Sequence, residues 1–218
     1  MTDIEIIKKC KDYVQQELKD AEGGHDWWHI QRVWNNALII SEKEGGHKLI
    51  IELAALLHDI ADSKFHNGDE EIGPKKAAQF LKSLSLPQSV IDAVDFIIRN
   101  ISFKGGNFEN KESSLELDIV QDADRLDALG AIGIARTFNY GGFKNRPLYD
   151  PSIKPNLNLS KEEYKSSKAP TLNHFYEKLF RLKDKMNTKT GRQMAEERHQ
   201  FMEEYVDKFL EEFNGPYS

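Results

Sequence analysis

The sequence is poor in cysteine and in long apolar runs. Its 218 residues include one cysteine, Cys10, so a disulfide within the chain is excluded. Apolar stretches such as Ala54–Leu57 with its neighbours are far shorter than the roughly 18–20 residues that a membrane-spanning helix needs. The opening residues, MTDIEIIKKC, lack the basic and then apolar pattern of an export signal. We therefore expect a cytoplasmic protein that does not bind membranes.

Basic charge is also in the minority. The 30 Lys and Arg residues stand against 36 Asp and Glu residues, which gives a net charge of −6. This balance disfavours a nucleic-acid polymer as a partner, although a single nucleotide beside a metal ion is compatible with it. Glycine and proline are sparse, at 14 and 7 residues, and no run alternates with the period of two that a strand requires. The sequence predicts an all-α fold.

Helical spacing of apolar residues divides the chain into predicted elements. Asp26 is placed to cap one helix, which Gly45 and Gly46 would close, and the three tryptophans at 27, 28 and 34 are expected in the core. We predict a single domain over residues 1–218, with a core at about 25–140 and C-terminal helices at about 171–214 that pack on it. The predicted helices cover about 4–22, 26–41, 48–61, 75–84, 87–98, 115–129, 131–140, 172–185 and 193–213, with loops at 103–114 and 141–169.

Three distant places put metal-binding side chains on otherwise apolar helices. His29 stands near the start of one helix, the pair His58-Asp59 ends the most hydrophobic one, and the stretch 122–127 holds three aspartates. Residues adjacent on a helix point about 100° apart, so His58 and Asp59 can both reach one point beyond the helix end. A charged aspartate in such a setting costs several kcal/mol unless it is paired or binds a cation. Imidazoles and carboxylates together suit Mn²⁺, Fe²⁺, Co²⁺, Ni²⁺ or Zn²⁺ better than Ca²⁺.

The order His29…His58-Asp59…Asp124 resembles the H…HD…D signature of the HD-domain metal-dependent phosphohydrolases. The surrounding sequences are similar to one branch of small bacterial HD proteins, and so is the tail over Asn173–Met202, so the resemblance covers most of the chain. It implies a single-domain helical bundle of the HD type with a central metal site, in which these four residues are the ligands. The similar sequences are HDWWHIQRV, AALLHDIADSKF and QDADRLDALGAIGIART.

Some neighbouring residues compete for these roles. His25-Asp26 is also an HD dipeptide, but its place before a helix favours Asp26 as a cap. Asp122 and Asp127 compete with Asp124, which the family match favours, and Asp127 could instead accept an imidazole N–H. No histidine lies between residues 66 and 174, where some HD proteins hold ligands of a second metal, and Asn100 stands there. We therefore expect one divalent ion, Mn²⁺ by preference, with Fe²⁺, Co²⁺, Ni²⁺, Zn²⁺ or Mg²⁺ as alternatives.

Catalytic and substrate-binding roles follow from the residues near this signature. Asp62, one turn beyond Asp59 on the predicted helix, is the first candidate for the general acid or base, as in some HD relatives, and His66 is the second. Arg32 and Lys64 are the predicted phosphate-binding residues, and the loop 141–169 could form a pocket wall or a lid. Further cations near the signature or at the start of that loop are Lys104, Arg136, Lys144 and Arg146.

The resemblance implies a metal-dependent phosphohydrolase that acts on a nucleotide or related phosphate ester through metal-activated water. Nucleoside triphosphate pyrophosphohydrolysis is one such reaction, and phosphomonoester or cyclic phosphodiester hydrolysis would use the same ion. The alternative is a catalytically silent HD-type domain for ligand sensing or interaction. A helical scaffold without metal would leave Asp59 and Asp124 buried and unpaired. The expected partner is a small phosphorylated molecule, and a homodimer is compatible with the sequence.

Overall fold

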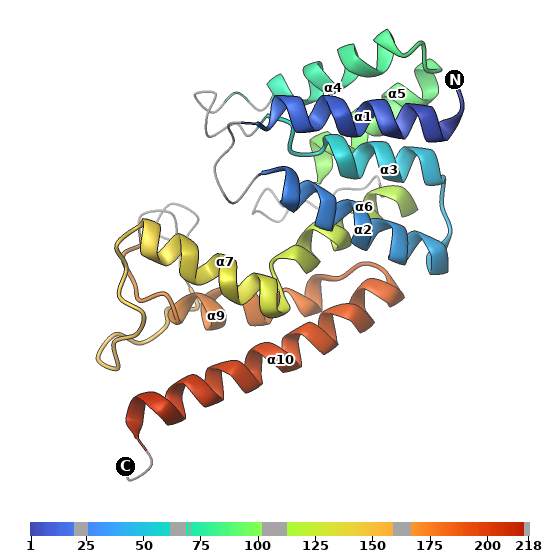
Figure 1. Ribbon diagram of the computed structural model, residues 1–218. Helices are drawn as coiled ribbons and strands as arrows, with labels where there is room; N and C mark the ends of the chain where they lie inside the picture. Colours follow the sequence, from blue (N-terminus) through green and yellow to red (C-terminus); the bar gives the residue numbers. More distant parts are fainter. Residues whose placement is uncertain (20–25, 62–68, 70, 102–112, 159–166, 216–218) are drawn as a thin grey trace. The chain divides into compact units, whose positions relative to one another are not determined.

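The computed structural model describes residues 1–19, 26–61, 69, 71–101, 113–158 and 167–215. Every regular element within these ranges is a helix, and no strand occurs in them, which confirms the all-α prediction (Figure 1). The chain forms two compact units, residues 1–124 and 125–218. Helix α6, Leu115–Asp127, crosses from the first unit into the second. Within the described residues, no helix is long and apolar enough to cross a membrane.

The first unit is built around α3, whose sequence KLIIELAALL is apolar on nearly every side. All residues from Ile51 to Leu57 are buried, as expected for a helix surrounded by others. Helix α3 packs against α1, α2 and α5, and Figure 1 shows it between α1 and α2. The other helices of this unit are α1 (Asp3–Glu17), α2 (Trp27–Glu44), α3 (Lys48–Leu57), α4 (Ile72–Ser83) and α5 (Gln88–Asn100).

The ends of α2 are set by the residues that the sequence indicates. The Asp26 carboxylate accepts a hydrogen bond from the backbone N–H of His29 at 2.9 Å, which satisfies one of the free N–H groups of the first turn. At the other end, Gly45 has a φ of +89°, a conformation that favours glycine, and it terminates the helix. Both predictions, the Asp26 cap and the glycine stop, are confirmed. The cap also fixes the backbone at His29.

The second unit consists of α7 (Gly130–Phe143), α9 (Asn173–Glu177), the 3₁₀ turns η2 (Leu179–Arg181) and η3 (Lys183–Lys185), and α10 (Lys189–Asn214). The 26-residue α10 packs along α7 and η3. In this unit the rings of Phe138, Phe175, Tyr205 and Phe209 form a connected group in which neighbouring centroids lie 6.0–6.4 Å apart. Phe175, which contacts Phe138 and Tyr205, is completely buried, and the other three rings are half-buried.

Several predicted helices differ from the structure. Helix α1 ends at Glu17 rather than near residue 22, and α10 begins at Lys189 rather than near residue 193. Helix α3 ends at Leu57 rather than near residue 61, because the backbone turns at His58, where the N–H of Ile60 bonds to the carbonyl of Leu57. The predicted helix 172–185 is instead the short α9 followed by η2 and η3. In these 3₁₀ turns backbone N–H groups bond to the carbonyl three residues back, and Leu179 of η2 is buried whereas no residue of η3 is.

The predicted domain organisation, one domain with the helices at about 171–214 packed on a core at about 25–140, stays a prediction. The expectation for the tryptophans is wrong. Trp27 and Trp34 are only half-buried, and Trp28 is 63% exposed. They miss the core because the buried face of α2 is formed by other positions, among them Ile30, Val33 and Ala37.

Candidate metal centre

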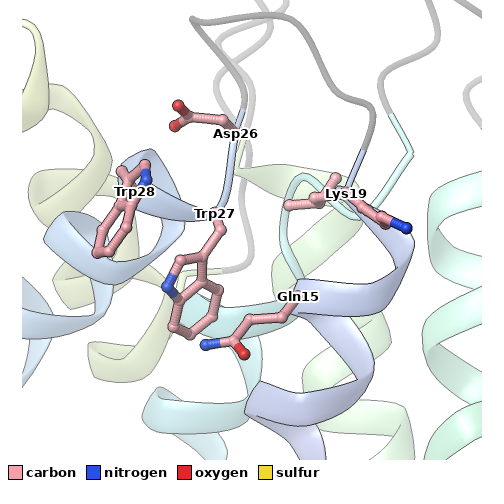
Figure 2. A pocket seen from close by; sticks show the side chains of 6 residues that line it. Gln15, Lys19, Asp26, Trp27 and Trp28 are labelled. Atoms are coloured by element: carbon pink, nitrogen blue, oxygen red, sulfur yellow. The ribbon is translucent and has the colours of Figure 1, made fainter.

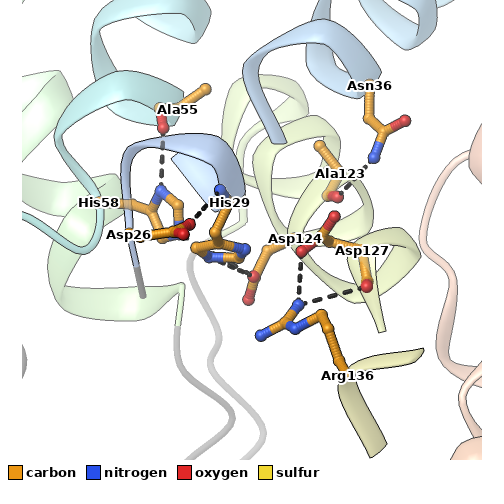
Figure 3. A network of polar contacts seen from close by, with 9 residues as sticks. All are labelled: Asp26, His29, Asn36, Ala55, His58, Ala123, Asp124, Asp127 and Arg136. Carbon is orange, nitrogen blue, oxygen red and sulfur yellow. Dashed lines mark hydrogen bonds and ion pairs between the residues drawn. The ribbon is translucent and has the colours of Figure 1, made fainter. Parts of the chain in front are cut away.

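Three segments of the first unit bring the predicted metal ligands together, and Figure 3 shows three of these ligands, His29, His58 and Asp124. The Oδ1 atom of Asp124 lies 3.6 Å from Nε2 of His29 and 3.9 Å from Nε2 of His58. His29, His58 and Asp59 also form a cluster in which one ligand atom from each lies within 4.8 Å of the others. Residues up to 95 positions apart in the sequence, from 29 to 124, therefore converge as the sequence predicted.

The local structure explains why these side chains meet. His29 is in the first turn of α2, held by the Asp26 cap, and its side chain is 3% exposed. His58 and Asp59 lie in the turn that ends α3, the most buried helix, so they extend from its end. Asp124 is on α6, whose other residues nearby, Ala123 and Leu126, are buried.

One face of the cluster is open to solvent. The side chains of His29 and His58 are only 3% and 5% exposed, whereas that of Asp124 is 39% exposed. The imidazoles are thus packed and fixed, while the carboxylate side of the cluster is accessible. A small molecule can approach the cluster from the side of Asp124.

The ring of His58 is oriented by a hydrogen bond from Nδ1 to the carbonyl oxygen of Ala55, at 2.9 Å. A carbonyl can only accept, so Nδ1 carries the proton and a neutral His58 presents the lone pair of Nε2. That lone pair is on the side of Asp124 and His29. The backbone of α3 therefore selects the tautomer that a metal ligand needs.

The spacing of the donor atoms fits a single ion of a transition metal. Two atoms that each bind such an ion at about 2.0–2.1 Å are separated by at most about 4.2 Å. The two distances from Asp124 to the histidines, 3.6 and 3.9 Å, are below this limit, and the donor atoms of His29, His58 and Asp59 all lie within 4.8 Å of one another. Two imidazoles with carboxylates also match the donor chemistry of Mn²⁺, Fe²⁺, Co²⁺, Ni²⁺ or Zn²⁺.

The structure distinguishes the three aspartates of α6. Asp122 and Asp127 are buried, 0% and 2% exposed, whereas the side chain of Asp124 is 39% exposed and lies beside both histidines. Asp127, in the second unit, pairs with Arg136, whose Nη1 donates to its Oδ2 at 2.5 Å and to its backbone carbonyl at 3.2 Å. The structure therefore gives Asp127 a guanidinium partner where the sequence suggested an imidazole. Arg136, a candidate phosphate-binding residue, holds this carboxylate.

The remaining predicted residues are only partly described. Asp62, Lys64, His66 and Lys104 lie outside the described residues, and so does His25 of the second HD dipeptide. Asp59 was expected to lie on a helix that extends to about residue 61, but it lies beyond the end of α3 at Leu57. Arg32 is half-buried on α2, one turn after His29.

Asn100, considered where a second metal might bind, is at the end of α5. Its side-chain Nδ2 donates to the carbonyl of Phe96 at 2.7 Å, and its own carbonyl accepts from Gln121 Nε2 at 2.7 Å. Within the part of the chain that the structure describes, His29, His58 and Asp59 form the one group of three potential ligands. This finding is compatible with a single-ion site.

The structure also contains a pocket of about 530 Å³ that the sequence did not predict (Figure 2). Three of its lining residues, Asp26, Trp27 and Trp28, directly precede His29 in the sequence. It is bounded by the end of α1 and the start of α2, and Asp26 and the exposed Trp28 belong to its wall. Its polar groups are an amide, a carboxylate and an ammonium group beside two indole rings. The lining residues are Gln15, Leu18, Lys19, Asp26, Trp27 and Trp28.

A buried amide beside the cluster was also missed by the sequence analysis. Nδ2 of Asn36 on α2 donates to the carbonyl of Ala123, the residue before Asp124, at 3.2 Å. The signal that could have found it is a polar residue on the buried face of α2, seven positions after His29.

Comparisons with known proteins agree with this geometry. A profile of the family described as "HD domain" matches residues 27–129, which include all four predicted ligands. The chain is 37% identical to Bacillus subtilis YpgQ over 99% of its own length and 97% of that protein.

Solved structures extend the likeness to nearly the whole chain. An HD-superfamily hydrolase from Bacillus thuringiensis is 46% identical, with a TM-score of 0.81, over 98% of this chain and 100% of that one. Bacillus subtilis YpgQ in complex with ADP is 35% identical, with a TM-score of 0.75, over 100% of this chain and 98% of that one. Identity at this level over complete chains is shared by members of one family. The chain belongs to the HD-domain family of hydrolases.

Proposed function

We propose that this chain is a metal-dependent phosphohydrolase that cleaves a nucleotide or a related phosphate ester. In this proposal His29, His58, Asp59 and Asp124 hold one divalent ion, Mn²⁺ by preference. The observation that carries the proposal is the convergence of Asp124 Oδ1 on the Nε2 atoms of both histidines, at 3.6 and 3.9 Å. The family membership supports a hydrolase, and the donor set supports the metal.

A bound divalent ion supplies two things to phosphate hydrolysis: it polarises a phosphoryl oxygen and lowers the pKa of a water molecule. The chain's own residues provide the rest of the site. His58 is held in the required tautomer by the Ala55 carbonyl, and His29 is held at its backbone by Asp26. The 39% exposure of Asp124 leaves an accessible side on which an anionic substrate can be bound.

A nucleotide is the proposed substrate because the solved relative YpgQ was crystallised in complex with ADP. That complex concerns the relative, and we carry its ligand class to this chain as a proposal. Nucleoside triphosphate pyrophosphohydrolysis is the first reaction to test. Arg32, one turn from His29 on α2, is the proposed contact to a phosphate group, together with Lys64.

Proton transfer needs a further group, and Asp62 remains our first candidate, with His66 second. Asp62→Asn removes a proton-accepting oxygen but keeps the size of the side chain. If Asp62 is the acid or base, this variant lowers kcat about 10²–10⁴-fold while it binds the ion as wild type does. A variant with near-normal kcat would remove Asp62 from the mechanism, and His66→Gln would then be tested in the same way.

The proposal is tested with metal-depleted protein, Mn²⁺ and a panel of nucleoside mono-, di-, tri- and cyclic phosphates. Products are separated by chromatography, so that a monophosphate with pyrophosphate is distinguished from a diphosphate with phosphate. We expect turnover of at least one nucleotide in wild type, none in His58→Ala, and wild-type turnover in His47→Ala, which changes an exposed histidine outside the cluster. Binding of Mn²⁺ and nucleotide without turnover across the panel would overturn the hydrolase and favour the silent sensing domain.

A further inference from the structure

A side-chain amide joins the helix of His29 to the helix of Asp124. Asn36 on α2 is 6% exposed, and its Nδ2 donates to the carbonyl oxygen of Ala123 at 3.2 Å (Figure 3). This carbonyl is part of the peptide bond that continues into the backbone nitrogen of Asp124. The hydrogen bond therefore holds the backbone next to Asp124 directly, and the two bonded residues are 87 positions apart in the sequence.

The amide and the first histidine are on the same side of α2. Asn36 follows His29 by seven residues, which is about two helical turns and brings the two side chains to nearly the same face. Both meet α6: Nε2 of His29 lies 3.6 Å from Asp124, and Nδ2 of Asn36 bonds to Ala123. One face of α2 thus contacts both the carboxylate of the site and the backbone that carries it.

Within the first unit, two other side-chain hydrogen bonds hold α6 farther from Asp124. Oε1 of Glu116 accepts the backbone N–H of His47, at the start of α3, at 3.0 Å. Nε2 of Gln121 donates to the carbonyl of Asn100, at the end of α5, at 2.7 Å. These two contacts fix α6 eight and three residues before Asp124, respectively. The Asn36 contact is directly adjacent to the ligand.

Packing alone does not require an amide at position 36. Its buried neighbours on the same face of α2 are apolar, for example Val33, Ala37 and Ile40, each 0% exposed. A buried amide costs free energy unless it is hydrogen-bonded, and the carbonyl of Ala123 supplies a hydrogen-bond acceptor for the donor of Asn36. The amide therefore specifies the position of α6 relative to α2.

We propose that Asn36 is a positioning residue of the candidate metal centre, which fixes the distance between Asp124 and His29. The inference rests on the proposed function in one respect, that these ligands bind a divalent ion. Loss of the Asn36 contact lets the α6 backbone shift relative to α2 by more than the tolerance of metal coordination, without removal of any ligand. Residues that orient ligands in this way typically affect metal affinity about 10–100-fold.

The test compares Asn36→Leu, which keeps the number and branching of the side-chain heavy atoms but removes the donor, with Ile40→Val, a buried control on the same helix. Two quantities are measured for each protein: the Mn²⁺ dissociation constant by titration calorimetry, and the free energy of unfolding of the metal-free protein in urea. We expect Asn36→Leu to weaken Mn²⁺ binding about 10–100-fold. Ile40→Val should change it less than about twofold, since an isoleucine side chain offers no hydrogen bond to the α6 backbone and is none of the proposed ligands.

Asn36→Ser, which is too short to reach Ala123, replaces Asn36→Leu if the latter does not fold, and the same loss is expected. Asn36→Gln keeps a donor and should recover part of the affinity. Mn²⁺ binding within twofold of wild type in Asn36→Leu or Asn36→Ser overturns the inference, and so does an equal loss in Ile40→Val. A wild-type protein that binds no Mn²⁺ would instead overturn the proposed function itself, so the two failures are distinguishable.

Discussion

The two compact units differ in how much aromatic rings contribute to their packing. Residues 1–124 have an aliphatic core, in which α3 contributes Leu or Ala at every position from 53 to 57. Residues 125–218 also bury mainly aliphatic side chains, but there a completely buried Phe175 contacts the rings of Phe138 and Tyr205, and Phe138 contacts Phe209. Aliphatic side chains fill small irregular spaces, whereas aromatic rings bury a large area each and pack edge to face or offset.

Polar groups are used differently in the two units as well. In the first unit the buried or nearly buried polar groups include two imidazoles that face an accessible carboxylate. In the second unit, two arginines donate hydrogen bonds to backbone carbonyls at the C-terminal end of α6. Arg198 donates to the carbonyl of Leu126, and Arg136 donates to that of Asp127. Burial lowers the pKa of the Arg198 guanidinium, which is bonded to this carbonyl. The first arrangement leaves lone pairs for a ligand, and the second satisfies acceptors within the fold.

This difference predicts that changes in the first unit's cluster alter function and that changes in the second unit alter stability. The largest effect is expected for His58→Ala. This substitution removes a proposed metal ligand, rather than a residue that only positions a ligand. Mn²⁺ affinity should therefore fall by more than about 100-fold, and turnover should be lost. In the metal-free protein the free energy of unfolding should change by only about 1 kcal/mol, the worth of the Ala55 hydrogen bond.

Calorimetry and urea titration of His58→Ala, beside the exposed control His47→Ala, check this separation. Full Mn²⁺ occupancy in His58→Ala would show that the ion does not use this histidine. A large loss of metal-free stability would show that the cluster is part of the core, and the comparison of the two units would fail.

Phe175→Ala tests the second unit. Removal of a completely buried phenylalanine should cost about 3–5 kcal/mol of unfolding free energy, because three neighbouring rings, Phe138, Phe180 and Tyr205, lose their partner. Phe201→Ala, at a position 48% exposed, should change the same quantity by less than about 0.5 kcal/mol. Under conditions where Phe175→Ala remains folded, its Mn²⁺ affinity should equal that of wild type. A selective loss of Mn²⁺ binding would contradict the division between the units.

The sequence predicted those features whose signals are local. Apolar residues at helical spacing located α2, α5 and α10, and Asp26 and Gly45 marked the ends of α2. The candidate ligands were also visible, because histidines and aspartates at the ends of apolar helices are unusual enough to be noticed one by one. Their convergence on one point came from the family resemblance, since no spacing within a single helix encodes it.

Features that depend on contacts between distant residues were missed or wrong. The hydrogen bond from Asn36 to Ala123 joins residues 87 positions apart, and the sequence around Asn36 does not indicate which residue accepts it. The predicted helix 172–185 has the right apolar spacing, but a spacing of three to four residues is shared by α and 3₁₀ turns. The exposure of Trp28 was likewise unexpected, because burial depends on which face of α2 the rest of the unit covers.

The ion pair of Asp127 and Arg136 tests the comparison of the two units with a smaller expected change in the free energy of unfolding. Arg136→Ala leaves a carboxylate that is 2% exposed without this guanidinium partner. We expect a loss of about 2–3 kcal/mol, below the ~3–5 kcal/mol of a fully buried pair, because Arg136 is 29% exposed. The double variant Arg136→Ala/Asp127→Asn should recover part of this loss in urea unfolding, since it no longer buries a charge. If Arg136→Ala instead lowers Mn²⁺ affinity as far as His58→Ala does, the pair belongs to the metal centre.

The smallest effect concerns pH and His174. Burial, together with the nearby cations of Lys178 and Arg146, lowers the pKa of His174 to about 3, from 6.5 in the unfolded chain. Between these values the unfolded state binds a proton that the folded state does not, so this group makes the protein less stable as the pH falls below 6.5. From pH 7 to pH 5 the contribution is about 2 kcal/mol. His174→Gln removes it, so urea titrations of chelator-treated protein should show a smaller loss of stability over this interval than in wild type. Equal losses would mean that His174 is protonated in the folded state as readily as in the unfolded one, and that the second unit leaves it accessible to water.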